Sequence, residues 1–529
     1  MTQRLQNLTI ASPAFFGLNT EESPVGMNPS YASIADNCVI DKRGRIGARK
    51  GHTVVSTNGA AVLGSSRGVE AVFEFTKFDG TVVVFSALNN NIYYGTSTLV
   101  ACALPSGYTI TANNWKIVSF NNDVYFFQTG YHPLVSVAGS TTLVKVVNPD
   151  DSHNAPFGNE VLAAFGRLWV ADVSGNNYTV YWSQLLDGDS FSGGDSGSLD
   201  LTKVWPTGYD EIVSLAEHNG FLIIFGKRSI VIYKGAEAIT TAAAFSLHDT
   251  IEGVGCIERD SVQATGNDML FLSSTGVVSL GRIIQEKSLP LRSVSKNVRT
   301  DLMDLIDLEV LPVKSTYSAS DAFYLITFPT SNITYCFDVR VPLEDGSFRA
   351  TTWSGFIPLC FGQLSAGGFY MGLSTGIVKY AGYLDIAATY TMSYFSNPLD
   401  FGNPTILKFL KKFNLTVIGG QATRAVLNWG YDYTENYSKQ VFTFGVGAAT
   451  AQFNVTEFGT KETTAVSGGS PPDVNYVETE FSGGITINTP KVNTTGSGNV
   501  VTIGVIAIIN NTAFSIQKID ILAKIGRLL

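Results

Sequence analysis

Residues 211–227 read EIVSLAEHNGFLIIFGK, two runs rich in Val, Ile, Leu and Phe on either side of Asn219-Gly220. Asn-Gly favours a tight hairpin because its residues tolerate positive φ. The same unit recurs around Asp79-Gly80, between VEAVFEF and TVVVFSAL, and around Asn121-Asn122, between WKIVSF and DVYFFQT. These repeats predict a chain that is mainly β and built from short antiparallel strands.

The turn centres recur at a nearly constant distance. Further centres are expected near Gly175, Gly266, Ser320 and Gly367, so that the centres at 80, 122, 175, 220, 266, 320 and 367 are 42, 53, 45, 46, 54 and 47 residues apart. A period of about 40 to 50 residues with four short strands per unit is typical of a β-propeller. Because one unit cannot cover its own apolar faces, the units stack and close into a ring. We predict six blades, or seven.

The composition supports this fold and adds a second domain. Of the 529 residues, 45% are hydrophobic and 15% are charged, which excludes a disordered chain. After about residue 385 the pattern changes to longer alternating runs such as AVLNWGYDY and QVFTFGVG, interrupted by SGGSPPD at 467–473. We therefore expect an N-terminal entry segment with a hairpin (1–60) that joins the platform, a β-propeller (61–385), and a C-terminal β-sandwich-like platform domain (386–529).

One stretch carries a helical pattern. In SKNVRTDLMDLIDL, Val298, Leu302, Leu305 and Ile306 fall on one stripe at a period of 3.6 residues, and Ser295 stands where an N-cap would. We expect a helix over 295–308 that packs against a blade edge.

The charge argues against a protein that grips nucleic acid. The net charge is -9, whereas binding phosphates needs basic side chains that release counterions. Passage of DNA is not excluded. The longest strongly apolar run, VVTIGVIAII at 500–509, is shorter than the ~20 residues that cross a bilayer, so no span is expected. The amino end lacks the apolar core of a secretory signal, so we expect assembly in the cytoplasm.

Neither the histidines nor the cysteines form a metal-binding pattern. The cysteines are scattered without a Cys-x-x-Cys pair, and the histidines do not cluster, so we expect no metal and no cofactor. The thiols are expected to be buried small hydrophobic groups in a reducing compartment. The residues concerned are Cys38, Cys102, Cys256, Cys336 and Cys360, and His52, His132, His153, His218 and His248.

Two patterns resemble catalytic sites without their context. Gly64-Ser65-Ser66-Arg67-Gly68 fits the Gly-x-Ser-x-Gly nucleophile elbow, but β-rich sequence follows where a helix is required. Asp187 and Asp189 in LLDGDSF could act as acid and base, although such a pair is more commonly part of a solvated loop. We expect no enzyme.

A basic segment lies in the first hairpin. DKRGRIGARK at 41–50 carries five basic side chains, and arginine binds carboxylate and phosphate bidentately. Two interpretations stay open: contact with another subunit or partner, DNA included, or a solvated hairpin with opposed charges nearby. The candidate contact residues are Lys42, Arg43, Arg45, Arg49 and Lys50.

Three segments resemble virion proteins of short-tailed bacteriophages. FFGLNTEESPVGMNPSYASIADNCVIDKRGRIGARKG (15–51) resembles the opening of such proteins through Gly17, Pro24, Asn37, Gly44 and the Arg49–Gly51 ending. Residues 211–262 look like the hub or packaged-DNA stabilisation protein of these tails, and FSIQKIDILAKIGRLL from Phe514 is similar to a closing strand of related proteins. Together they cover about a third of the chain.

The resemblance implies a tail nozzle or tail hub, of the kind of tail tubular protein B. It would be a homo-hexameric ring below the portal and the head-to-tail adaptor, in contact with tail fibres or tailspikes and with a tail needle or plug. Double-stranded DNA would pass through it transiently and without sequence specificity. The location implied is the virion tail.

A function from another class also fits the composition. A carbohydrate-binding or carbohydrate-cleaving propeller would use aromatic loop residues to stack on sugars, and Trp205, Tyr209 and Trp353 are the candidates for this role. A hexamer with a channel would favour the conduit, and a monomer or trimer that hydrolyses polysaccharide would favour this alternative.

Overall fold

The computed structural model describes residues 5–526 except for 25, 65–67, 111–113, 129, 148–154, 207, 240–244, 267, 286–292, 366, 422, 435, 445–462, 467–473 and 478–486. It divides the chain into two compact units. Unit 1 contains Met1–His52, Arg349–Trp353 and Ala381–Leu529, and unit 2 contains Thr53–Phe348 and Ser354–Tyr380. The sequence placed the boundaries at 60 and 385, and nothing in it pointed to the short insertion of Arg349–Trp353 into unit 1.

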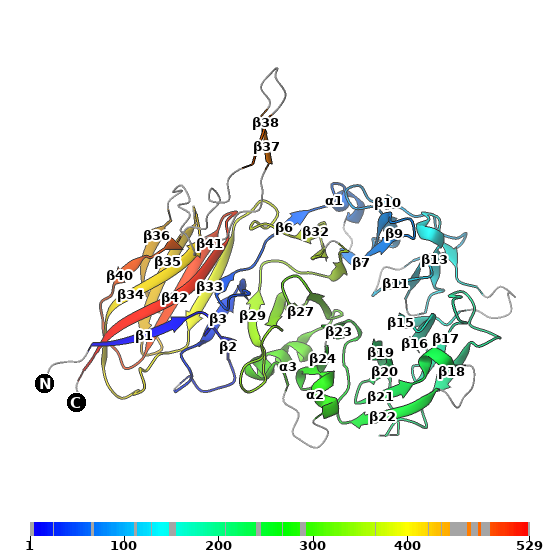
Figure 1. The fold of residues 1–529 in the computed structure, drawn as a ribbon, viewed down its shortest axis with the longest axis horizontal. Coiled ribbons are helices and arrows are strands. Elements are labelled where there is room, and N and C mark those ends of the chain that lie inside the picture. The colour runs from blue at the N-terminus through cyan, green and yellow to red at the C-terminus, as the bar shows by residue number, and fades with distance from the viewer. Residues whose placement is uncertain are drawn as a thin grey trace. The chain divides into compact units, whose positions relative to one another are not determined.

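Unit 2 is a β-propeller, as predicted. Its sheets follow one another around a ring in chain order (Figure 1). The first four sheets in chain order have four strands each: β7 (Val69–Thr76), β8 (Val82–Leu88), β9 (Asn91–Tyr94) and β10 (Val100–Ala101); β11 (Lys116–Phe120), β12 (Asp123–Phe127), β13 (Leu134–Ser136) and β14 (Val144–Lys145); β15 (Gly158–Ala164), β16 (Arg167–Val173), β17 (Thr179–Trp182) and β18 (Gly197–Asp200); β19 (Ile212–His218), β20 (Phe221–Gly226), β21 (Ser229–Lys234) and β22 (Ser246–Glu252).

The remaining blades complete the ring. They are β23 (Gln263–Ala264), β24 (Met269–Ser273) and β25 (Gly276–Ser279); β26 (Lys314–Ser318), β27 (Phe323–Phe328) and β28 (Ile333–Asp338); and β30 (Cys360–Gln363), β31 (Phe369–Leu373) and β32 (Gly376–Tyr380), to which β6 (His52–Val54) is added. The described residues thus form six separate sheets plus the three strands β26–β28, in line with the predicted six or seven blades. Val55 donates its N–H to the Ile377 carbonyl, so the start of unit 2 joins its last blade.

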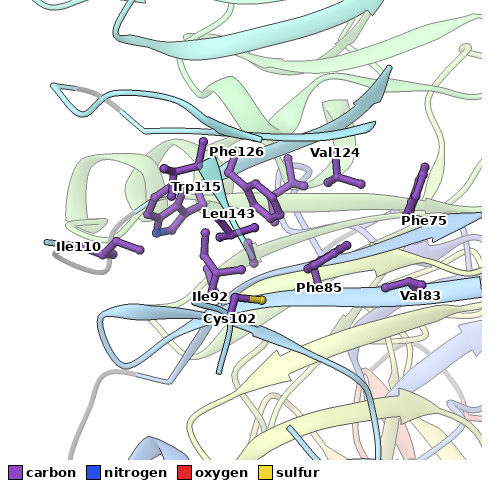
Figure 2. Close-up of a cluster of buried hydrophobic side chains, with 14 residues drawn as sticks. Phe75, Val83, Phe85, Ile92, Cys102, Ile110, Trp115, Val124, Phe126 and Leu143 are labelled. Carbon is purple, nitrogen blue, oxygen red and sulfur yellow. The ribbon is translucent and has the colours of Figure 1, made fainter. Parts of the chain in front are cut away.

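The second strand of a blade is a continuous apolar run because neighbouring blades cover both of its faces. In β8 every residue after Val82 is buried, and every residue of β27 is buried. Between the first two blades Phe85 and Phe126 meet edge to face with ring centroids 5.4 Å apart, in a cluster that also contains Trp115 and Leu143 (Figure 2). Burial of such aromatic rings stabilises the packing of one blade on the next.

The predicted turns coincide with hairpins, with one exception. Gly80, Asn122, Gly220, Gly266, Ser320 and Gly367 each lie between the first and second strands of a blade. Gly175 lies one hairpin later, between β16 and β17, and the equivalent turn of its blade is Phe165-Gly166 with positive φ at both residues. The sequence prediction was wrong there because Phe165 carries none of the usual turn signals.

Unit 2 also contains short helices. They are α1 (Gly59–Leu63), α2 (Leu280–Gln285) and α3 (Arg299–Leu308), with the 3-10 turns Val137–Gly139, Ala236–Ala238, Arg259–Ser261 and Lys296–Val298. The helix predicted over 295–308 is confirmed in α3, where Leu302 is buried. Ser295 does not cap it: its hydroxyl accepts the Val277 N–H at 2.9 Å, which ties the helix start to β25 instead.

Unit 1 contains two sheets. One orders β39 (Ile487–Asn488), β34 (Lys408–Gly419), β42 (Phe514–Ile525), β5 (Ile46–Ala48) and β4 (Cys38–Ile40), with β1 (Leu5–Ala11) on β42 and β40 (Lys491–Asn493) on β34. The other orders β29 (Arg349–Trp353), β2 (Gly17–Leu18), β3 (Tyr31–Asp36), β33 (Tyr390–Ser396), β41 (Val501–Ile509), β35 (Arg424–Tyr431) and β36 (Ser438–Thr443). A separate hairpin pairs β37 (Thr463–Val466) with β38 (Val474–Val477). The segment 467–473 lies outside the described residues.

The two sheets of unit 1 are in contact. The Cys38 thiol lies 3.4 Å from the Ser393 carbonyl of the other sheet, and the rings of Phe444 and Phe514 are 6.1 Å apart. Burial alternates along β34 and β42, as expected for strands with one covered face. All five cysteines are buried, as predicted.

Candidate functional site: a charged network among the inner strands

The inner strands of the propeller bring charged side chains together at the centre of unit 2. Lys116 comes from β11, Glu160 from β15 and Lys314 from β26, and Arg259 and Asp260 come from the 3-10 turn before β23. These residues belong to four different blades. Charged groups are rarely buried unless they are paired, so their convergence marks the candidate site.

Asp260 is the centre of this network. Arg259 binds both of its carboxylate oxygens, with Nε to Oδ1 at 2.9 Å and a terminal nitrogen to Oδ2 at 2.7 Å. The Lys314 ammonium donates to the same Oδ2 at 2.5 Å. Lys314 also donates to the Asn114 side-chain oxygen at 2.5 Å, and Arg259 donates to the Asn159 carbonyl at 2.7 Å. The ion pair therefore links residues from separate blades.

Glu160 is a second buried carboxylate beside it, with only 1% of the residue exposed. Its Oε1 accepts the Leu215 N–H at 3.1 Å and the Ser214 hydroxyl at 3.3 Å. Its Oε2 lies 3.4 Å from the Lys116 ammonium and 3.8 Å from Arg259. Glu160 thus connects the next blade, through Ser214 and Leu215 of β19, to the same cations.

Burial and charge shift the acids in opposite directions. Burial tends to raise the pKa of Asp260, but Arg259, Lys314 and Lys116 together hold this pKa well below its ordinary value. Burial raises the pKa of Glu160 in spite of Lys116 and Arg259. Burial and the neighbouring Asp260 carboxylate raise the pKa of Glu258 to about 7. Glu258 therefore changes its charge near neutral pH.

Two of the cavities that adjoin the network have Lys116 in their walls. One of about 280 Å³ is lined by Glu70, Glu74, Lys116, Asp260, Lys314 and Gln363 among others. The second, of about 540 Å³, is lined by Lys116, Ser214, Glu217 and the apolar residues around them. Lys116 is the charged group that both share. Within the network Asp260 and Glu160 are paired with cations, and this arrangement suits electrostatic bridging between blades.

The predicted basic contact residues differ in exposure in the structure. Lys42 and Arg43 are exposed at the β4–β5 turn, and Lys50 is half-buried. Arg45 is buried and pairs with Asp41 at 2.5 Å. For Arg45 the opposed charge expected in a solvated hairpin is Asp41.

Arg49 is wrong as a candidate contact residue because it is fully buried within unit 1. Its two terminal nitrogens bind both carboxylate oxygens of Asp385 at 2.9 and 2.7 Å, and its guanidinium lies 4.2 Å from the centre of the Tyr390 ring. His52 lies 3.1 Å from the same carboxylate. The physical reason is that Asp385, far along the chain, neutralises the guanidinium inside the fold.

The residues proposed for a carbohydrate site are also dispersed. Trp205 and Trp353 are buried, at 4% and 1% exposure, so neither ring can stack on a sugar. Tyr209 is exposed. Asp187 accepts the Asp189 N–H at 3.0 Å, and burial raises the pKa of Asp189. The pair thus forms part of a loop turn next to Tyr125.

Sequence reasoning missed the network. Arg259 and Asp260 lie at the end of the segment 211–262, which resembles tail proteins, but Lys314 and Glu160 stand in ordinary strand patterns.

Residues 65–67 of the elbow pattern and His153 lie outside the described residues. Within the described ranges, no three His, Cys, Asp or Glu side chains gather to hold a metal ion, and no helix has the length and apolar character to span a membrane.

Comparison with known proteins gives only distant structural likenesses. No protein-family model matches the sequence, and no curated protein matches it. PorZ, an essential bacterial surface component of the type-IX secretion system of Porphyromonas gingivalis, is 13% identical with a TM-score of 0.35 over 59% of this chain and 36% of PorZ. The chain thus spans about a third of PorZ.

Two further solved structures are similarly distant. A protein from Lactobacillus plantarum is 14% identical with a TM-score of 0.33, over 57% of this chain and 92% of its own. The WD40 domain of coronin from Toxoplasma gondii is 8% identical with a TM-score of 0.30, over 72% of this chain and 86% of its own. None of the three is described as a bacteriophage tail protein. At this level of similarity no function is carried over to this chain.

Proposed function

We propose that this chain is a structural subunit of a bacteriophage tail. Six copies form a nozzle or hub ring below the portal and adaptor, which continues the DNA channel, retains the packaged genome and conducts it at ejection. The chain makes and breaks no bond in this role. The proposal starts from the three segments that resemble tail proteins of short-tailed bacteriophages.

The observation that carries the proposal is the pairing of two of these segments. Strand β42, which contains most of the resembling C-terminal segment, pairs with β5 of the resembling N-terminal segment through Ser515–Gly47 and Ile516–Ile46. Strand β1 pairs along β42 from Leu5–Lys524 to Ala11–Lys518. Segments nearly 500 residues apart in sequence thus form one sheet. This is the arrangement expected if they serve one surface, here the ring contacts of the platform.

The centre of the propeller bears on where the DNA would pass. Arg259 bonds to Asn114 and Asn159 while its partner Asp260 bonds to Lys314, so side chains of different blades meet among the inner strands. Charged groups locked together in this way bridge the inner strands of separate blades. In the proposed ring the channel therefore runs between the copies and not through the axis of each propeller.

The charge fits a conduit. Six copies would carry 6 × (-9) = -54 charges, and a conduit must hold DNA weakly because each firmly neutralised phosphate resists sliding. The closed blades supply edge-protected, rigid walls for such a ring.

Mass and imaging test the proposal. Native mass spectrometry is expected to find six copies of the 56.8 kDa chain, about 341 kDa, and electron microscopy of the particle is expected to show the ring at the tail with an open centre. A protein that stays monomeric at every concentration and is absent from tails would refute the proposal. A monomer that cleaves polysaccharide would instead support the carbohydrate function.

A further inference from the structure

Two Asn-Gly pairs occur in the chain, Asn58-Gly59 and Asn219-Gly220. Such a pair can react with itself, because the backbone nitrogen of a glycine, which has no Cβ to shield it, can attack the side-chain carbonyl carbon of the preceding asparagine. The two pairs carry the same reacting groups, so their surroundings decide which of them reacts.

Asn219-Gly220 is the two-residue turn of the β19–β20 hairpin. Strand pairing continues up to His218 and Phe221 on either side of it, and the two turn residues have positive φ, 52° and 78°. Both are exposed. Among the described residues other than the chain neighbours of Gly220, none has an atom within 4 Å of the position that a Cβ of Gly220 would take. The turn therefore has room for the Asn219 side chain to approach the Gly220 nitrogen.

The two residues before the turn carry groups that can move protons. The Glu217 carboxylate accepts the Gly220 N–H at 3.1 Å, and this is the proton that the nitrogen must lose in order to attack. The His218 Nε2 lies 3.0 Å from the Asn219 amide nitrogen, which is the atom that must leave as ammonia. A base and an acid thus lie within hydrogen-bond reach of the two reacting groups.

Asn58-Gly59 is held in a different way. The Asn58 side chain donates to the Leu99 carbonyl at 3.0 Å and accepts the Leu99 N–H at 2.8 Å, so both ends of its amide are bound. Gly59 begins α1 and is buried, and a Cβ at Gly59 would lie 2.4 Å from the Ser56 hydroxyl. Attack on the Asn58 amide requires both of its hydrogen bonds to break in a crowded place. We expect this pair to stay intact in the folded protein.

We propose that Asn219 is a self-modification site, which Glu217 and His218 convert to aspartate and isoaspartate in the folded protein. The Gly220 nitrogen bonds to Cγ of Asn219 and gives its proton to Glu217. The Cγ–Nδ2 bond then breaks while protonated His218 donates a proton to Nδ2, and ammonia leaves behind a cyclic imide. Water opens this ring at either of its two C–N bonds, which gives aspartate or isoaspartate, and Glu217 and His218 return to their starting states by proton exchange with water.

The reaction changes the turn in two ways. Each converted chain carries one more negative charge than the -9 of the unmodified chain, next to Glu217 in the sequence. In the isoaspartate product the backbone runs through the former side chain, so the turn becomes one carbon longer. The proposal does not depend on the proposed tail function, because it concerns one hairpin of a single chain.

Ageing of the folded protein tests this proposal. The purified full chain is kept at neutral pH, and the peptides that contain Asn58 and Asn219 are followed by mass spectrometry and by an isoaspartate methyltransferase assay. Asn219 is expected to convert at least about tenfold faster than Asn58, because only Asn219 has the reacting groups in position. In urea, where the fold is lost, the two pairs are expected to convert at similar rates. An Asn219 that converts no faster than Asn58 in the folded protein overturns the proposal.

Variants of the flanking residues test their roles. Glu217→Gln keeps an acceptor for the Gly220 N–H but is a much weaker base, and His218→Gln keeps a polar contact but cannot supply the proton. Each is expected to slow the conversion about tenfold. The matched control is Glu237→Gln, an exposed glutamate in the 3-10 turn between β21 and β22 of the same blade, which should leave the rate unchanged. Thermal unfolding confirms that the variants keep the fold, and equal rates in the unaltered protein and both flanking variants would remove Glu217 and His218 from the reaction and refute the site as proposed.

Discussion

Two arginines, one in each unit, are buried against an aspartate, and their surroundings differ. Arg259 in the propeller shares Asp260 with Lys314, and Glu160 and Lys116 lie within 4 Å of the same group of charges. Arg49 in unit 1 has Asp385 with His52 beside it, and the Tyr390 ring covers its face. The first is a network of several acids and bases, and the second is a single ion pair.

The two arginine sites differ in the pKa values of their acids. Burial and the nearby Asp260 carboxylate raise the pKa of Glu258 in the propeller to about 7. Burial would also raise the pKa of Asp385, but the hydrogen bonds from Arg49 and His52 lower it to about 2. Among the crowded acids of the propeller, Glu160 and Glu258 resist ionisation, whereas Asp385 with its two donors stays charged. Glu258 and Asp385 should therefore make opposite contributions to the pH dependence of stability.

The largest effect is expected from Asp260→Ala. This change leaves Arg259 and Lys314 as buried cations without their shared carboxylate, and breaking a buried ion pair costs about 3–5 kcal/mol. Chemical denaturation should show this loss in the transition of the propeller. Asp304→Ala on the exposed side of α3 is the matched control and should leave the transition in place. A loss below about 1 kcal/mol for Asp260→Ala would mean that the network does not hold the blades together.

A smaller effect of the opposite sign is expected from Glu258→Gln. The folded protein keeps the Glu258 proton up to a pKa of about 7, and the unfolded chain loses it near 4.5, so stability falls as the pH rises between these values. Gln cannot lose that proton. The variant should match the unaltered protein at pH 4 and exceed its free energy of unfolding by about 2–3 kcal/mol at pH 8. Denaturation curves at pH values from 4 to 8 measure the difference in free energy of unfolding between the variant and the unaltered protein. A difference that does not change with pH contradicts the prediction.

The sequence predicted the propeller because its signals are local. Asn219-Gly220 and Asp79-Gly80 favour hairpins whatever surrounds them, and apolar runs such as that of β8 reflect burial on both faces. Phe165-Gly166 escaped notice because the rest of the blade forces Phe165 into positive φ, which its side chain does not favour. Local propensity therefore gives the repeat and misses the turn that tertiary packing imposes.

The candidate site was much less predictable, for the same reason. Arg49 reads as a surface charge within DKRGRIGARK, and only Asp385, 336 residues later, makes it a buried group. Lys314 and Asn114 are 200 residues apart and meet because the inner strands of different blades converge. Whether a basic residue is buried or presented depends on which distant carboxylate reaches it, and no spacing in the sequence records that.

The smallest effect is expected from Asp385→Asn, which isolates the single ion pair. Asp385 ionises near a pKa of about 2 in the folded protein and near 3.8 in the unfolded chain, so its contribution is present above about pH 4 and disappears as the pH falls towards 2. The contribution is about 2 kcal/mol. The asparagine side chain of the variant still accepts a hydrogen bond but cannot ionise. The variant should therefore have a lower free energy of unfolding than the unaltered protein at pH 6, and this difference should disappear on acidification. The excess in free energy of unfolding of Glu258→Gln also disappears on acidification, but it has the opposite sign. Because the two residues lie in separate units, the effect of the double variant should be the sum of the two single effects at each pH. If the Asp385→Asn deficit persists at pH 2, the loss is one of packing around Tyr390 and not of charge, and the contrast between the two buried arginines would fail.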